Sequence, residues 1–197
     1  MVDVSGHLAM ALLFAAPAWI IWKRRGALAF AGFALVTAML PDVDLVLKTF
    51  LPIRHHGITH TILFVAVMSV LGGAIAAHML TERFNANRLI HSETITEETV
   101  FVFATSGFLT GGLSHIFADL LSAPDVAQPL EPLWPLYDKP MAIDVIYYDS
   151  PLWNFGLLAV ALAVHFVLFR HESYPLETRY RIGDRDDETA PAAADVD

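Results

Sequence analysis

The chain has 197 residues, of which 55% are hydrophobic, and its mean hydropathy is +0.51. The apolar share of a soluble domain is about 45 to 50%, so this composition indicates an integral membrane protein with one compact helical unit. The formal net charge of -9, from 21 acidic and 12 basic residues, argues against a nucleic-acid partner. Cysteine is absent, so any metal has to be held by histidine and carboxylate side chains.

Five apolar stretches predict an all-α, polytopic membrane fold with about five hydrophobic helices. The stretches cover residues 8–22, 27–40, 58–80, 100–121 and 152–169. The last three approach or exceed the roughly 20 residues that a bilayer core requires. The first two are shorter, and they would span only a thinned or polar-lined region, or with their charged ends drawn into the interface.

The ends of the first two stretches carry further signals. The first has no basic residues before it and ends at Lys23-Arg24-Arg25, the reverse of a secretory signal peptide, so we expect it to be retained. The second stretch is followed directly by Pro41, which removes a backbone hydrogen-bond donor and disfavours a helical conformation at Leu40. We expect that helix to end there, leaving Asp42 and Asp44 on a turn.

The connections differ in character. Residues 81–99 form a short polar link, whereas residues 122–150 combine five prolines with tryptophan and tyrosine, a mixture that suits irregular backbone at headgroup depth. We expect the second connection to be a lid or re-entrant loop over a site. A single helical membrane domain would cover residues 1–172, and residues 173–197 would form an acidic, disordered tail.

Basic residues predict the orientation in the membrane. If five segments alternate, nine of the twelve lysines and arginines fall on one side: Lys23, Arg24, Arg25, Arg83, Arg88, Arg170, Arg179, Arg181 and Arg185. The other side keeps Lys48, Arg54 and Lys139. The positive-inside rule makes the first group cytoplasmic and places the N-terminus outside, in a multi-pass protein of the cell membrane.

Residues 54–61 hold three histidines in six positions, His55, His56 and His60, beside a long apolar run. Imidazole is the commonest protein ligand for zinc-like metals. His115 and Asp119 are four residues apart inside an expected span, so they share one helix face, and ionisable groups within spans are functional by default. In the alternating topology His7, Asp42 and Asp44 reach the same outer face. The sequence therefore predicts one metal site there.

Other interpretations of single residues stay open. Asp42 and Asp44 could merely end a helix at the interface, or one could bind metal while the other holds a ligating imidazole. His56 could face water. A lone histidine such as His7 is a weak signal. Four more histidines lie on the opposite side and are expected to be structural or solvated: His78, His91, His165 and His171.

The ordered set of motifs resembles the YdjM-like membrane-bound metal-dependent hydrolases. The set comprises His7, Leu40-Pro41-Asp42-Val43-Asp44, His55-x-Gly57-Ile58-Thr59-His60, Gly112-Leu113-Ser114-His115 with Asp119, and Leu133-Trp134-Pro135. It covers residues 4–140. The family pattern has arginine where this chain has His56 and serine where it has Thr61, and Arg54 could take the place of that arginine. A more distant similarity is to the zinc phospholipase C and nuclease group.

We therefore expect metal-assisted hydrolysis of an ester or phosphoester in a lipid or membrane-proximal substrate. A divalent ion, zinc by the histidine-rich ligand set, would lower the pKa of water to about 7. The predicted metal ligands are His7, Asp42, Asp44, His55, His60, His115 and Asp119, enough for two ions. Asp44, as general base, and His60 are the predicted catalytic residues. Ser114 lacks the nucleophile-elbow motif and adjoins His115, which disfavours a serine hydrolase.

Two other classes of function are compatible with parts of the sequence. A transporter or metal carrier would also place ionisable groups beside short, broken helices. A non-catalytic membrane scaffold would explain the apolar stretches but not the ordered histidines and aspartates. The expected partners are membrane lipids and the lipid or phosphoester substrate.

Overall fold

The computed structural model describes residues 2–86 and 95–171, and within them it is all-helical, with no β-strand. The predicted fold class is therefore confirmed. The expected acidic tail, residues 173–197, lies outside the described residues.

The helices follow the five apolar stretches, with two short additions. The elements are α1 (Val4–Ala15), α2 (Ala18–Ile21), α3 (Arg24–Thr37), α4 (Val43–Leu47), the 3-10 turn η1 (Ile58–His60), α5 (Ile62–Ala86), α6 (Glu97–Leu121) and α7 (Pro151–Arg170). The first stretch is divided because Pro17 interrupts it between α1 and α2. The long helix α6 begins where the side chain of Thr96 accepts a hydrogen bond from the backbone N–H of Thr99, at 3.1 Å.

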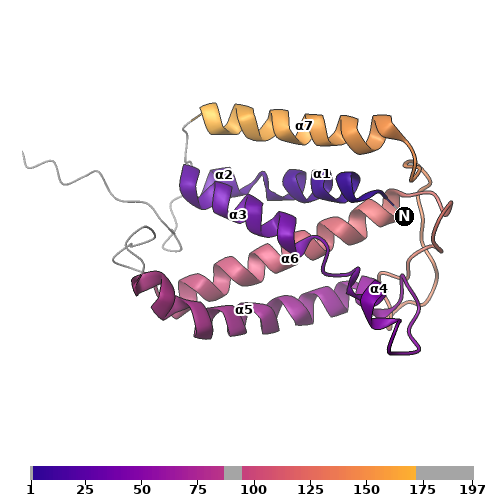
Figure 1. Ribbon diagram of the computed structural model, residues 1–197, viewed down its shortest axis with the longest axis horizontal. Coiled ribbons are helices and arrows are strands. Elements are labelled where there is room, and N and C mark those ends of the chain that lie inside the picture. The colour runs from indigo at the N-terminus through magenta and orange to yellow at the C-terminus, as the bar shows by residue number, and fades with distance from the viewer. Residues whose placement is uncertain (1, 87–94, 172–197) are drawn as a thin grey trace, which may run out of the picture.

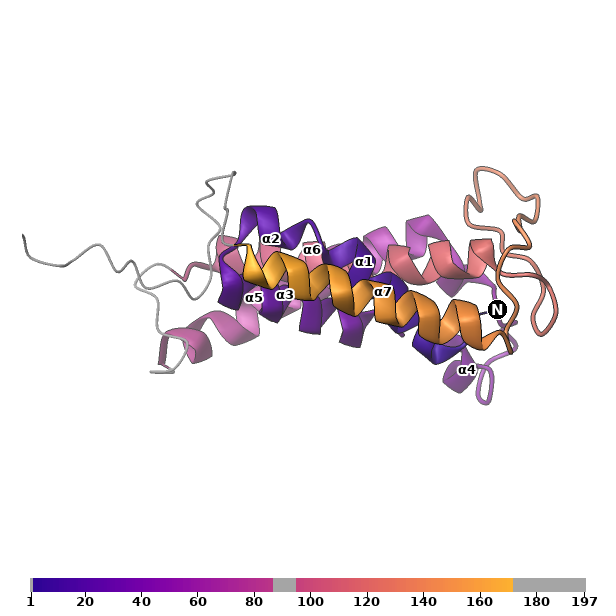
Figure 2. The same ribbon diagram turned by 90° about the horizontal axis from the view of Figure 1, so that it is seen from above.

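The helices run back and forth along one elongated bundle (Figures 1 and 2). α7 packs on α1, α1 and α3 pack on each other and on α6, and α5 lies along the other side of α6. The N-terminus, α4 and the loop 122–150 gather at one end, which we call the site end (Figure 1). The opposite end, which carries the Lys23-Arg24-Arg25 cluster at the start of α3, is called the far end.

Within residues 2–86 and 95–171, four helical segments are long and apolar enough to cross a membrane: Val4–Ile21, Ile62–Ala86, Glu97–Leu121 and Pro151–Arg170. α3 has 14 residues and is about 21 Å long, shorter than the hydrocarbon core of about 30 Å. It packs closely on α6, and the Thr37 hydroxyl donates a hydrogen bond to the carbonyl of Gly107 at 3.0 Å. The chain leaves α3 against the side of α6, so the residues that follow enter the bundle near His115.

The segment after α3 departs from the prediction of a turn. Asp42 does lie in a turn, but Asp44 lies inside the five-residue helix α4 and is buried. Helix α3 ends at Thr37, three residues before the Leu40 that Pro41 predicted, and the sequence did not reveal the new helix. Helix α4 is too short to form by itself, so the contacts of its buried residue Asp44 help to hold it.

The loop 122–150 is irregular, with two isolated β-bridges, Ser122 to Ile146 and Leu130 to Met141. It is tied to the helices at the site end, since the N–H of Ile62 donates to the carbonyl of Pro132 at 2.9 Å. The irregular backbone expected for this segment is therefore observed. Its action as a lid stays a prediction.

Candidate metal centre

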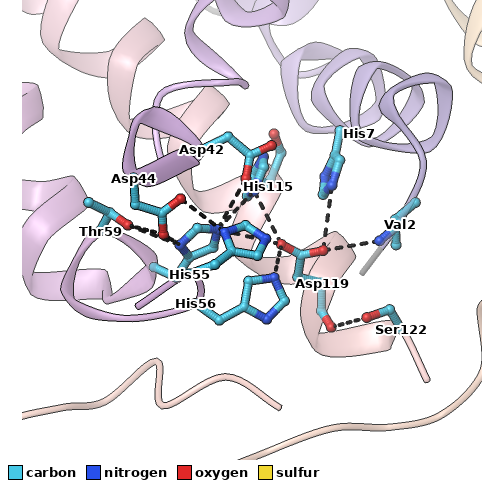
Figure 3. Close-up of polar contacts among 12 residues, drawn as sticks. Val2, His7, Asp42, Asp44, His55, His56, Thr59, His115, Asp119 and Ser122 are labelled. Atoms are coloured by element: carbon cyan, nitrogen blue, oxygen red, sulfur yellow. Dashed lines mark hydrogen bonds and ion pairs between the residues drawn. The ribbon is translucent and has the colours of Figure 1, made fainter. Parts of the chain in front are cut away.

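Eight histidine and aspartate side chains from four parts of the chain converge at the site end (Figure 3). His7 comes from α1, and Asp42 and Asp44 flank the start of α4. Three histidines precede α5, and the last turns of α6 supply the remaining pair. The eight are His7, Asp42, Asp44, His55, His56, His60, His115 and Asp119. All seven predicted ligands are thus brought together, and His56 joins them.

Four of these side chains place their ligand atoms in two triangles that share the edge between His60 and His115. The Nε2 atoms of His60 and His115 lie 3.3 Å apart, and Oδ1 of Asp42 is 3.5 Å from each of them. Oδ2 of Asp119 lies 3.2 Å from Nε2 of His115 and 3.8 Å from that of His60. Tetrahedral zinc with bonds of about 2.0 to 2.1 Å keeps its ligand atoms about 3.3 to 3.4 Å apart. The spacing therefore fits one divalent ion.

Buried polar atoms without hydrogen bonds support this interpretation. Oδ1 of Asp42 and Oδ2 of Asp119 are both buried and accept no hydrogen bond. A buried acceptor without a partner costs about 1 to 3 kcal/mol, and more when it is charged. A cation bound by these oxygens and the neighbouring imidazoles would satisfy both carboxylates, so the groups present fit a metal ion.

Asp44 lies behind two of the imidazoles. Its Oδ1 atom is 2.9 Å from Nδ1 of His55, and its Oδ2 atom is 3.2 Å from Nδ1 of His60. The hydroxyl of Thr59 also donates to Oδ2 at 2.9 Å. A carboxylate on Nδ1 fixes the tautomer that leaves Nε2 free, and this is the common outer partner of metal-bound histidine.

His56 turns toward the same centre through an unusual backbone conformation. Its φ of 59° lies in the left-handed region, which is uncommon for residues other than glycine. Its Nδ1 atom donates to the carbonyl of Gln128 in the loop 122–150 at 2.6 Å, because a carbonyl can only accept. That tautomer leaves Nε2 as a bare acceptor, 3.5 Å from Oδ2 of Asp119. Two acceptors facing each other indicate a further ligand position.

His7 approaches from the other side of Asp119. Its Nε2 atom lies 3.5 Å from Oδ1 of Asp119, and its ring stacks on that of His115 with the ring centres 3.9 Å apart. Both of its nitrogens are buried without a hydrogen bond. The backbone N–H of Val2 also donates to Oδ1 of Asp119, at 3.1 Å. His7 therefore lies beside the two triangles, with its nitrogens available to a ligand.

The charges of the groups outside the spans suit cation binding. Burial opposes ionisation of Asp42, but the neighbouring imidazoles of His115 and His60 outweigh it and hold its pKa well below the usual range. For Asp44, burial is likewise outweighed, here by His60 and His55, and its pKa falls to about 2. Both carboxylates are therefore ionised at neutral pH.

The pKa values of His56 and His60, two histidines outside the spans, shift in opposite directions. Burial lowers the pKa of His56 to about 4, so its imidazole is neutral at pH 7 and can donate a lone pair. Burial also acts to lower the pKa of His60, but Asp42 and Asp44 outweigh it and raise that pKa. An ion bound here would have to displace the His60 proton, which couples metal binding to proton release.

His165, which is buried in α7, holds helices together and lies outside the metal centre. Nδ1 of His165 accepts from the indole N–H of Trp19 at 2.9 Å, and its Nε2 donates to the carbonyl of Leu12 at 2.8 Å. Both ring nitrogens are thus used in holding α7 to the first span. This confirms the expectation that His165 is structural, whereas His91 lies outside the described residues.

His56 belongs to the cluster of the candidate metal centre, although the sequence left open whether it faces water. The signal that could have found it is its position, since it occupies the place of the arginine in the pattern His-Arg-Gly-x-Thr-His. The left-handed backbone that turns its ring inward has no sequence signature. Grouping by distance gives four sets of three side chains that could hold a metal ion, and one of them contains His55, His56 and His60.

Comparison with known proteins gives one match. The model of the YdjM inner membrane protein family matches residues 1–181. No curated protein and no solved structure matches the chain. The family match covers every residue of the candidate metal centre, and its inner-membrane location agrees with the four helical segments that can cross a membrane. The chain therefore belongs to the YdjM inner membrane protein family.

Proposed function

We propose that this protein is a membrane-embedded, zinc-dependent hydrolase that cleaves an ester or phosphoester of a lipid or of another membrane-proximal substrate. The observation that carries the proposal is the close spacing of ligand atoms from Asp42, His60, His115 and Asp119, in which each carboxylate oxygen lies 3.2 to 3.8 Å from the Nε2 atoms of the two histidines. Imidazoles and carboxylates are common zinc ligands, and the absence of cysteine removes the thiolate alternative. An ion held by three of these groups would keep one coordination position for water, which it would activate, and it would polarise the scissile group.

His55 and Asp44 are proposed to form the proton-transfer pair. Asp44 was expected to be the general base, but its two oxygens already face His55, Thr59 and His60. The Nε2 atom of His55 is buried without a hydrogen bond, which leaves it able to accept a proton. Asp44 would hold the His55 ring in place and stabilise the imidazolium that forms. It would also orient His60 as a ligand.

The surroundings of the centre support a membrane-proximal substrate. A cavity of about 310 Å³ adjoins residues 54–61 and is lined by Ile53, Ile58 and Trp134, with Arg54 and Glu131 at its edge. The guanidinium of Arg54 contacts the Glu131 carboxylate at 2.8 Å. An anionic substrate group could replace Glu131 on Arg54, while the apolar wall receives the hydrocarbon part.

The alternative of a transporter or metal carrier rests on the same side chains. Transporter sites usually lie near the membrane midplane between repeated halves, whereas this cluster lies at one end of the bundle (Figure 1). The position at the site end therefore favours chemistry at the membrane surface.

The decisive experiment incubates purified protein in phospholipid vesicles with zinc and measures release of water-soluble headgroup. We expect release that a chelator stops, that His115→Ala removes together with the bound zinc, and that His55→Gln removes while zinc stays bound. Zinc crossing the vesicle membrane without any headgroup release would instead identify a carrier. If neither the wild type nor the His55→Gln variant binds zinc, the proposal fails at its first step.

A further inference from the structure

A second cavity lies away from the metal centre, between α3, α5 and α6. Its volume is about 760 Å³, within the range of about 300 to 1,000 Å³ that ligand pockets occupy. Ala29 of α3 and Ile75 of α5 line its walls, and Phe103 and Ala104 of α6 also contribute to the lining. We call it the apolar groove. None of its lining residues belongs to the metal centre.

The length of the apolar groove matches one leaflet of a bilayer. On α5 its lining extends from Gly72 to Phe84, twelve helical steps or about 18 Å along the helix axis. The hydrocarbon core of a bilayer is about 30 Å thick, so one leaflet contributes about half of that. A groove of this length suits an acyl chain that enters from one membrane surface.

Two aromatic rings close the inner end of the groove. Phe33 and Phe108 meet edge to face, with ring centres 5.1 Å apart. Gly72 and Gly107 make the room for them, since a Cβ at Gly72 would lie 2.7 Å from the Phe108 ring and one at Gly107 would lie 2.3 Å from the Phe33 ring. A transmembrane helix from a second copy would have to continue past this barrier, whereas an acyl chain can end there.

Two arginines lie at the other end of the groove. Arg25 lines it and is exposed at the start of α3. Arg83 lies four residues after Met79 and three after Leu80, so it continues the stripe of α5 that lines the groove, and it too is exposed. The neighbouring Arg24 points elsewhere, because its guanidinium donates to the carbonyl of Phe169 at 3.3 Å.

We propose that the apolar groove binds one anionic phospholipid from the leaflet at the far end, the side predicted to be cytoplasmic. An acyl chain lies between α3 and α5 and ends at Phe33 and Phe108, and the phosphate group contacts Arg25 and Arg83. The bound lipid would complete the packing of α3, the short helix that leads to Asp42. This inference does not depend on the hydrolase proposal.

The test is native mass spectrometry of the full chain in detergent with added phosphatidylglycerol or phosphatidylcholine. The wild type should retain one phosphatidylglycerol per chain in preference to phosphatidylcholine. Arg25→Gln with Arg83→Gln should reduce that preference about 25-fold, at about fivefold per arginine. Ala29→Phe, which fills the groove from an exposed position, should abolish retention of either lipid.

Matched controls lie on α7, outside the groove. Arg170→Gln removes an exposed arginine at the same end of the bundle, and Ala159→Phe adds the same bulk at another exposed alanine. Both should retain phosphatidylglycerol as the wild type does. Equal retention of the two lipids by the wild type, or equal loss in Ala29→Phe and Ala159→Phe, would overturn the proposal. A dimer that Ala29→Phe alone disrupts would assign the groove to a second copy and also overturn it.

Discussion

The Nε2 atoms of His60 and His115 lie 3.3 Å apart, although 55 residues separate the two histidines in the chain. The Nδ1 atom of His60 lies 3.2 Å from the carboxylate of Asp44, so the Nε2 atom of His60 faces His115. Two ring nitrogens this close repel each other unless a proton or a cation lies between them.

Removing a ligand from α6 should remove the metal. We expect His115→Ala and Asp119→Ala each to lose bound zinc, as measured by elemental analysis of purified protein, because each supplies one of the clustered ligand atoms. His78→Ala, an exposed histidine on α5, is the matched control and should keep its zinc. Unchanged zinc content in both α6 variants would contradict the proposed centre.

Replacing Asp44, whose carboxylate contacts the Nδ1 atoms of His55 and His60, should weaken zinc binding without abolishing it. Asp44→Asn keeps the size of the side chain but no longer offers two charged acceptors to His55 and His60. Loss of such a partner typically costs 10- to 100-fold in metal affinity. Competition with a chromophoric chelator would measure the change. Complete loss of zinc, as in Asp42→Asn, would show that Asp44 is itself a ligand.

Zinc should stabilise the folded protein, because it neutralises carboxylates that are buried together. At a free zinc concentration about 100-fold above the dissociation constant, the free energy of unfolding should rise by about 2.7 kcal/mol. Thermal unfolding in detergent, with and without a chelator, measures this rise. The His115→Ala variant should show no response to zinc, and a response equal to that of the wild type would contradict the assignment.

Close packing of α3 on α6 should be sensitive to one added methyl group. A Cβ at Gly111 would lie 2.7 Å from the backbone of Thr37 and Ala38, which cannot move without shifting α3. We expect Gly111→Ala to lower the free energy of unfolding by about 1 to 3 kcal/mol. Gly32→Ala on α3 is the control, since a Cβ there meets nothing within 4 Å. Equal stability of the two variants would argue against this contact.

The orientation in the membrane can be tested with single cysteines, because the native chain contains none. Leu136→Cys and Phe50→Cys, both highly exposed at the site end, should react with an impermeant thiol reagent added to cells with a permeabilised outer envelope. Glu82→Cys near the far end should not. The reverse pattern would place the metal centre on the cytoplasmic face and redirect the search for a substrate.

Much of the architecture could be predicted from the sequence, because hydropathy and helical spacing are local properties. The long apolar stretches became α5, α6 and α7, and the four-residue spacing of His115 and Asp119 placed them on one helix face. Pro41 predicted that the second helix would end close by, and α3 ends at Thr37, three residues before the expected Leu40. Alternation of the segments was enough to predict that the polar groups would meet at one end of the bundle.

Only the tertiary structure decided what each side chain faces. Helix α4, the inward turn of His56 and the position of Asp44 behind two imidazoles all depend on contacts between segments far apart in the chain. His56, for example, is held by the carbonyl of Gln128, 72 residues away. The apolar groove likewise arises where three helices diverge. Local sequence cannot encode such relationships, because a side chain's direction and a gap between helices are fixed by the packing of the whole bundle.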